Sequence, residues 1–177
     1  AGVDKTMEAV VFPLLSKIGM LWITSHIRPA QEHIVSNLIR QKVLAAADQL
    51  PVAKSSANTV LLFLPEGERH ELGLLYMYYK LKKKHFNTIY LGADVPLDDI
   101  RELVLHKKPA FIYIHLTGSA PYINMPDFLK ALSAVSKSAI CIVTGDAAAS
   151  YTQKLPKNII LGLSPAEVPG FLTESGR

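Results

Sequence analysis

The residues with the clearest chemical potential stand between Pro65 and Gly73, where Glu68 and His70 lie close together. An imidazole in an exposed loop can ligate a metal through one ring nitrogen when a carboxylate or backbone carbonyl fixes the other, and Glu68 could supply that contact. Gly73 would let a large ligand pass close to the helix backbone. The pattern indicates ligand or metal binding, although a surface histidine beside charged residues would give the same spacing.

A second group of candidate residues lies earlier, where Trp22 is followed after nine residues by Glu32 and His33. If Trp22 ends one helix and the other two lie in the first turns of the next, a short connection brings all three to one end of a helical pair. Such a cluster could cover a ligand. A core tryptophan and a polar helix start are the alternative interpretations.

A third candidate is Gly145, which follows Thr144 and the apolar run 139–143. Small residues at the end of a parallel strand leave space for the extended part of a ligand. A tight turn would use the same residues. Gly145 is therefore predicted either to line a ligand or to let the chain turn.

These candidates need structural elements that bring them to one edge of the protein. The run 58–64 has the length and β-branched content of a buried parallel strand, and residues 72–81 follow helical spacing. His70 is therefore expected in the turn at the carboxyl end of a first strand. In an open α/β sheet, that edge is the crevice in which ligands bind.

The second part of the chain alternates apolar runs with helical patterns. The expected strands are residues 58–64, 88–91, 111–115, 140–144 and 158–161. The expected helices are residues 69–84, 97–105, 125–136 and a last one capped by Ser164, with a turn at 92–96. This alternation predicts an α/β fold with a five-stranded, doubly wound parallel sheet in the order 2-1-3-4-5.

The first part of the chain is predicted to be helical. Apolar residues recur at three- and four-residue spacing over residues 4–25, and a kink or a split into two helices is expected near Pro13. A second helix is expected from Pro29 to about Leu50, because proline suits the first helical turn. Two helices cannot enclose a core alone, so a truncated helical bundle is expected, with its first helix upstream of this fragment.

A stretch of small residues at 51–57 marks the predicted domain boundary. It separates a helical bundle cap at residues 1–52 from a doubly wound domain at residues 57–177. We find no internal repeat and no low-complexity segment.

Composition narrows the functional class. The 177 residues are 49% hydrophobic with a formal net charge of +4, which suits globular folding. The lysines between residues 80 and 84 suit a helix C-terminus better than a nucleic-acid patch. The single cysteine, Cys141, lies in an apolar run and cannot form an internal disulfide, so a reducing cytoplasm is expected. No membrane span or signal peptide is expected.

Two of these patterns resemble a known family. Residues 68–73 resemble the Asp-x-His-x-x-Gly signature of cobalamin-binding domains, in the variant with Glu that occurs in MerR-type cobalamin-dependent photoreceptor repressors. Trp22 with Glu32 and His33 resembles the Trp, nine residues, Glu-His pattern that those repressors carry in a helical bundle. Residues 90–97 are similar to the family's second strand and following turn. The resemblance covers nearly the whole chain.

The resemblance implies a Rossmann-like, flavodoxin-like domain that binds cobalamin, with adenosylcobalamin as the main form and methylcobalamin as the alternative. His70 would be the metal ligand, binding cobalt from below after displacing the corrinoid's own base, and Gly73 would line the threaded tail. The residues near Trp22 would cover the upper face, where an adenosyl or methyl group sits. The implied cofactor-binding residues are Trp22, Glu32, His33, Glu68, His70, Gly73, His115, Thr117 and Gly145.

The chain departs from the family at three positions. His115 stands where members usually have the serine that holds the threaded base, and Thr144 replaces the first glycine of a Gly-Gly pair. Both changes predict a tighter or more polar tail pocket. Ile23 stands where light-sensing members have a histidine that can bind cobalt after photolysis. The resemblance therefore favours cobalamin binding over light sensing.

These observations predict the cobalamin-binding sensor module of a transcriptional regulator, responsive to light in one version of the hypothesis. It would not be an enzyme, would form homo-oligomers and would bind DNA only through an upstream domain absent from this chain. The alternatives are a corrinoid shuttle subunit of a methyltransferase, and a cobalamin-free protein-interaction module of the same fold. Coverage of the upper face by Trp22 fits sensing better than rapid methyl delivery.

Overall fold

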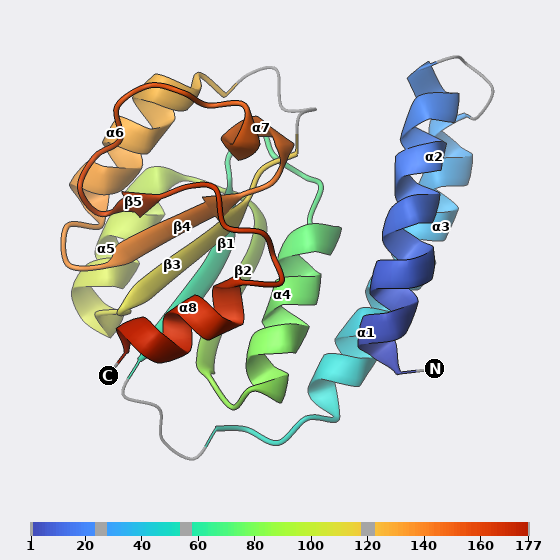
Figure 1. Cartoon of the computed structure of the whole chain (residues 1–177), viewed down its shortest axis with the longest axis horizontal. Helices are drawn as coiled ribbons and strands as arrows, with labels where there is room; N and C mark the ends of the chain where they lie inside the picture. Colours follow the sequence, from blue (N-terminus) through green and yellow to red (C-terminus); the bar gives the residue numbers. More distant parts are fainter. Residues whose placement is uncertain (1, 24–27, 54–57, 118–122, 177) are drawn as a thin grey trace. The chain divides into compact units, whose positions relative to one another are not determined.

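The structure, a computed structural model, describes residues 2–23, 28–53, 58–117 and 123–176 (Figure 1). The chain divides into two compact units, Ala1–Leu50 and Pro51–Arg177. The predicted end of the first helix at Ser25 and residues 54–57 of the predicted linker lie outside the described residues. None of the described helices combines the length and apolar character that a membrane span requires.

The first unit is helical, as its spacing predicts. Its elements are α1 (Val3–Thr6), the π-helix η1 (Met7–Val11), α2 (Phe12–Ile23) and α3 (Pro29–Asp48). The first three follow one another without a break. The irregularity near Pro13 is the π-helix η1, and the helix does not split into two separate helices there. Proline cannot donate to the carbonyl four residues earlier, and a π-turn, in which Phe12 N–H donates to the Met7 carbonyl, absorbs the interruption just before it.

The second unit is α/β, with one five-stranded sheet whose strands are all parallel. The strands are β1 (Thr59–Pro65), β2 (Asn87–Val95), β3 (Phe111–His115), β4 (Ile140–Thr144) and β5 (Ile159–Ile160). Their order is β2-β1-β3-β4-β5, which confirms the predicted doubly wound topology. The order reverses at β1, so the carboxyl ends of β1 and β3 flank the crevice in which such sheets bind ligands.

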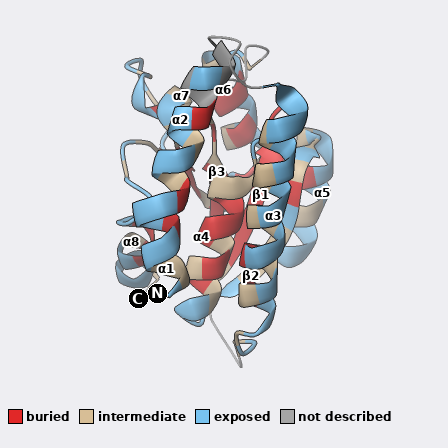
Figure 2. Cartoon of the chain, turned by 90° about the vertical axis from the view of Figure 1, so that its right-hand side faces the viewer, coloured by how far each residue is buried: buried red, intermediate tan, exposed pale blue. Residues whose placement is uncertain are grey.

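The helices of the second unit are α4 (Leu72–Lys83), α5 (Leu97–Lys107), α6 (Met125–Val135), α7 (Asp146–Ala149) and α8 (Val168–Ser175). Figure 1 shows α4 and α8 against one face of the sheet and α5 and α6 against the other. Because both faces are covered, β1 reads as a continuous apolar run, and its residues from Val60 to Leu64 are fully buried. Figure 2 shows the same burial along β1 and on α4.

Several elements differ from the predictions. β2 continues to Val95 instead of turning at residue 92, because Gly92 and Asp94 adopt positive φ and let the strand pass β1 with two register shifts. Helix α4 begins at Leu72, three residues later than expected. Residues 146–149 form the short helix α7. The last helix begins at Val168, since Ser164 donates to the Glu167 carboxylate in a preceding turn.

The core contains few polar groups, and those it contains are paired. Cys141 is fully buried on β4, with its thiol 3.0 Å from the Ser136 hydroxyl. Burial raises the pKa of this thiol to about 11, which keeps it protonated and unreactive. The described residues include no buried side-chain nitrogen or oxygen without a hydrogen-bond partner. The core therefore holds the strand ends in fixed positions beneath the loops.

Candidate functional site

The loop between β1 and α4, residues 66–71, is tied to the end of β2 by Asp94. The Asp94 carboxylate accepts hydrogen bonds from Gly67 N–H at 2.8 Å and from Arg69 Nε at 3.3 Å. The Gly67 N–H is the main reason that the pKa of Asp94 lies below its usual value. In return, Asp94 N–H donates to the Glu68 carbonyl at 3.3 Å. These contacts fix the loop backbone on both sides of Glu68.

Glu68 is the polar centre of this loop and is fully buried. One carboxylate oxygen accepts from the His70 backbone N–H at 2.9 Å and lies 2.7 Å from His70 Nδ1. The other accepts from Thr117, through its backbone N–H at 3.2 Å and its hydroxyl at 2.9 Å. Burial disfavours the ionised carboxylate, but the hydrogen bonds from His70 and Thr117 outweigh it, so the pKa of Glu68 lies below its usual value.

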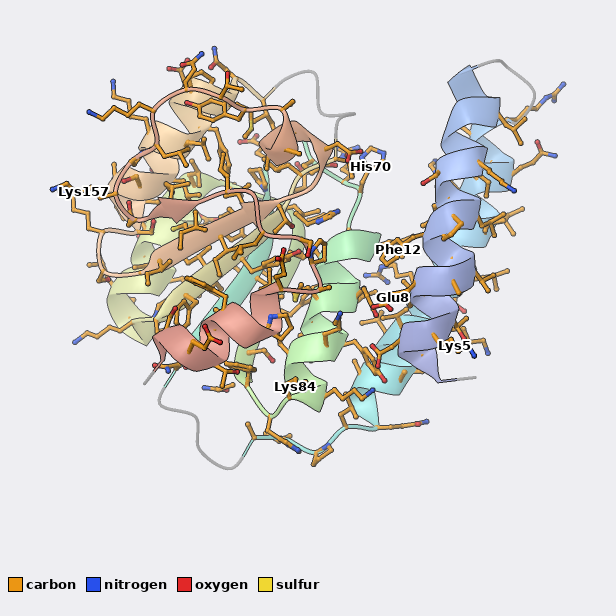
Figure 3. All side chains as sticks on the ribbon, viewed as in Figure 1. Lys5, Glu8, Phe12, His70, Lys84 and Lys157 are labelled. Atoms are coloured by element: carbon orange, nitrogen blue, oxygen red, sulfur yellow. The ribbon has the colours of Figure 1, made fainter. Side chains whose placement is uncertain are left out.

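This contact determines how His70 can act as a ligand. An ionised carboxylate can only accept hydrogen bonds, so Nδ1 of the imidazole carries the proton that faces Glu68. In a neutral ring, Nε2 is then the nitrogen that donates a lone pair. The His70 side chain is 59% exposed, and Figure 3 shows it at the edge of the α/β unit, beyond the start of α4. Histidines that bind metals are commonly held by a carboxylate in this way, so the metal-ligand role of His70 stays a prediction that this geometry allows.

The surroundings of His70 limit the kind of metal group it could bind. Among the residues that the structure describes, no three or more His, Cys, Asp or Glu side chains gather in a way that could hold a metal ion. A metal already held by a macrocycle needs only an axial ligand from the protein, and one oriented imidazole supplies it.

Gly73 and His115 are in contact, which their separation in sequence did not predict. A Cβ built on Gly73 would lie less than 3.0 Å from three ring atoms of His115, namely Cγ, Cδ2 and Nε2. The absent side chain of Gly73 is therefore replaced by the imidazole of His115. The space expected to receive a ligand tail is filled by the protein itself in this structure.

Hydrogen bonds from β3 and β4 hold the His115 ring in place. His115 and Thr144 are register partners on these neighbouring strands, and His115 Nδ1 lies 2.9 Å from the Thr144 hydroxyl. The Tyr113 hydroxyl lies 2.7 Å from the same Thr144 oxygen. Burial lowers the pKa of His115, against the opposing charges of Asp146 and Glu68. The ring is thus a neutral hydrogen-bonding group.

Gly145 has a structural role that does not require a ligand. Its φ is +95°, a conformation that strains other residues, and a Cβ there would overlap the backbone carbonyl of Leu116. Leu116 N–H donates to the Thr144 carbonyl at 2.9 Å, so the chain segments that leave β3 and β4 run in direct contact. This close approach corresponds to the tight-turn alternative, while its role in lining a ligand stays a prediction.

The remaining predicted site residues belong to the first unit. Trp22 lies in α2, and its side chain is outside what the structure describes. Glu32 and His33 lie in the first turns of α3, where His33 Nδ1 is 2.7 Å from Glu32 Oε2. The His33 side chain is 69% exposed. The pair therefore lies on the surface of the helical unit, as a polar helix start or a ligand-facing pair would.

The structure brings together Glu68, His70 and Thr117, and places Gly73 against His115. Two residues that sequence reasoning did not include in the site belong to it. Asp94 orders the His70 loop, and Tyr113 completes the hydrogen-bonded group around His115. An acidic residue after a glycine in an expected turn was the only signal for Asp94. A tyrosine inside an apolar strand gave no signal.

Two transcriptional repressors are similar to this chain in sequence. No family model matches the chain. It is 28% identical over 163 residues to the HTH-type transcriptional repressor CarH of Myxococcus xanthus, which covers 92% of this chain and 54% of CarH. It is 32% identical over 107 residues to the HTH-type transcriptional repressor CarA of the same organism, covering 60% of this chain and 35% of CarA. The chain is therefore homologous to these repressors and spans about half of their length or less.

A solved structure supports the fold assignment. The monomethylamine corrinoid protein of Methanosarcina barkeri is similar with a TM-score of 0.68 and 17% sequence identity, covering 91% of this chain and 78% of that chain. At this level of identity the likeness concerns the fold alone. The α/β unit therefore has the Rossmann-like architecture that a corrinoid protein also has.

Proposed function

We propose that this homologue of the repressors CarH and CarA is a cobalamin-binding sensor module of a transcriptional regulator. The observation that carries the proposal is the Glu68–His70 pair, in which a fully buried carboxylate holds Nδ1 of an exposed imidazole at the carboxyl edge of the sheet. His70 would hold the cobalt of the corrinoid through Nε2, while Glu68 holds Nδ1. When bound, the cofactor would supply an organometallic bond, and the protein would hold the cofactor and change its oligomeric state in response.

The upper face would be covered by Trp22, Glu32 and His33 of the helical unit. A tryptophan is a large, rigid platform for an adenosyl group, so we propose adenosylcobalamin as the form bound and methylcobalamin as the alternative. The Glu32–His33 pair would supply polar contacts to the same group. With the cofactor seated, the helical unit and the α/β unit would be held in one arrangement, and self-association surfaces would be stabilised by that preference.

The module would act without catalysing a reaction and would associate into homo-oligomers in the cytoplasm. DNA binding would belong to an upstream domain, in keeping with the HTH type of the repressors it matches in part. Cobalamin would then set the oligomeric state, and through it the affinity for DNA. Light would act through the bound cofactor, and Ile23 would offer no nitrogen to hold cobalt as a histidine would.

An absorption titration with adenosylcobalamin in the dark tests the proposal. We expect a bound cofactor whose own base is detached and whose lower ligand is His70. His70→Ala should lose this spectrum, whereas His106→Ala, on the exposed end of α5, should keep it. Absence of binding, or an unchanged spectrum in His70→Ala, would contradict the proposal. Sedimentation with and without the cofactor tests whether cobalamin sets the oligomeric state, and identical masses would contradict that part of the proposal.

One observation favours a second candidate, a cobalamin-free interaction module of the same fold. The His115 ring fills the space over Gly73, and the Leu116 carbonyl fills the space beside Gly145. Protein atoms therefore take the space that each glycine would leave for a ligand. A shuttle subunit of a methyltransferase would instead bind methylcobalamin as tightly as adenosylcobalamin and keep one mass throughout. The same titration, repeated with methylcobalamin, separates these alternatives from the sensor.

A further inference from the structure

We infer that His115 is a specificity-determining residue that favours corrinoids with no nucleotide tail over complete cobalamins. The inference rests on the proposed function and concerns the lower half of the same site. It starts from the contact between the His115 ring and Gly73, because a corrinoid tail would need the space that this ring occupies.

The position of the tail follows from the role of His70. When an imidazole replaces the cofactor's own base on cobalt, the displaced base and its linker remain on the same side of the corrin as that imidazole. After His70 the chain enters α4, and Gly73 stands in its first turn, where the His115 ring covers the helix backbone in place of a side chain. A displaced base that descends beside this turn meets the His115 ring.

The His115 ring is held where it lies. Nδ1 is 2.9 Å from the Thr144 hydroxyl, and Thr144 is fixed in turn by the Tyr113 hydroxyl at 2.7 Å. Displacing the ring would break this contact and the longer one, 3.5 Å, between His115 Nδ1 and the Tyr113 hydroxyl, while Tyr113 and Thr144 would stay paired. The free-energy cost of admitting a tail is therefore mainly the loss of the hydrogen bonds of His115.

The strand ends beside His115 are also fixed. Gly145 packs directly against the Leu116 carbonyl, and the Leu116 N–H is bonded to Thr144 across the strand ends. A move there would separate β3 from β4 in a close-packed sheet. A corrinoid without a tail avoids both costs, because it needs only the His70 ligand and the surface above it.

The test compares adenosylcobinamide, which lacks the nucleotide tail, with adenosylcobalamin by absorption titration in the dark. Because both compounds carry the adenosyl group, contacts of the protein with that group affect both dissociation constants equally. Detaching the cobalamin base costs affinity in every variant, so the measured quantity is the ratio of the two dissociation constants in wild type and in His115→Ser. We expect wild type to favour adenosylcobinamide by about tenfold more than His115→Ser does, equivalent to one hydrogen bond with its packing.

His115→Asn keeps a polar partner for Thr144 and provides a second variant if His115→Ser does not fold, as judged by circular dichroism. His106→Ser is the matched histidine control and should keep the wild-type ratio. An unchanged ratio in the folded His115 variant, or tighter binding of adenosylcobalamin to wild type, overturns the inference and leaves the proposed function standing. Binding of neither corrinoid to any variant overturns both.

Discussion

Thr117 donates two hydrogen bonds, one from its backbone N–H and one from its hydroxyl, to the same oxygen of Glu68. The two residues are 49 positions apart and follow different strands, β3 and β1. Glu68 thus joins the two strand ends that flank the crevice while its second oxygen orients His70. Loss of this carboxylate would affect both the loop and the ligand.

Glu68→Gln is expected to weaken cobalamin binding roughly 10- to 100-fold, the usual effect of removing the partner of a metal-bound histidine. The amide keeps the size of the side chain, but its nitrogen cannot accept from His70 or Thr117. Glu66→Gln, an exposed neighbour in the same turn, is the control and should bind normally. Equal affinities of wild type and Glu68→Gln in a spectral titration would show that Glu68 does not orient the ligand.

Substitutions at Gly145 and Gly162 distinguish the effect of backbone strain from the effect of steric overlap. Their φ angles are similar, +95° and +85°, but an added Cβ meets the Leu116 carbonyl at the first and nothing within 4 Å at the second. We expect Gly162→Ala to lower the free energy of unfolding by about 1 kcal/mol and Gly145→Ala by about 3 kcal/mol. Chemical denaturation measures both, and equal losses would mean that β3 and β4 separate easily at their ends.

His115 should make stability depend on pH. Its usual pKa is 6.5, and burial among Tyr113, Thr144 and Gly73 lowers that pKa in the folded state, although Glu68 and Asp146 oppose the shift. Below pH 6.5 the unfolded chain binds a proton at His115 before the folded chain does. The stability that the neutral ring contributes is therefore complete above pH 6.5 and is lost as the pH falls through the pKa of the folded state.

We therefore expect the free energy of unfolding of wild type to fall more than that of His115→Ser as the pH is lowered below 6.5. Thermal and urea denaturation at matched ionic strength measure the difference. Parallel pH profiles for the two proteins would mean that the His115 ring is solvated when folded.

Trp22→Ala tests the proposed upper face. If Trp22 stacks on the adenosyl group, the variant should lose more affinity for adenosylcobalamin than for hydroxocobalamin, which has no such group. The helical unit should keep its helix content by circular dichroism. Equal losses for both corrinoids, together with a fall in stability of about 3 to 5 kcal/mol, would identify Trp22 as a core residue.

Much of the fold follows from local patterns in the sequence. The apolar run of β1 and the helical spacing of α4 place His70 at the carboxyl end of the first strand, as the structure has it. The length of β2 could not be predicted, because Gly92 and Asp94 resemble a turn and only pairing with β1 keeps them in the strand. Local spacing does not report such pairing.

The candidate site was predictable only where its members are close in sequence. Glu68 and His70 are two residues apart, and their contact follows from the loop that holds them. The contact of His115 with Gly73 depends instead on β3 lying beside β1 and on the hydrogen bond that sets the His115 rotamer. The sequence shows a histidine at this position, but its contact with Gly73 becomes apparent only in the folded structure.

The burial of Cys141 makes the protein suitable for site-specific labelling. It is the only cysteine in the chain, and its protonated, fully buried thiol should react slowly with maleimides. A cysteine introduced on the exposed surface of α3 and another on α5 could therefore carry a fluorescent donor and acceptor without removal of the native thiol. Energy transfer between the dyes would then follow, in single molecules, any motion between the helical and α/β units as a corrinoid binds.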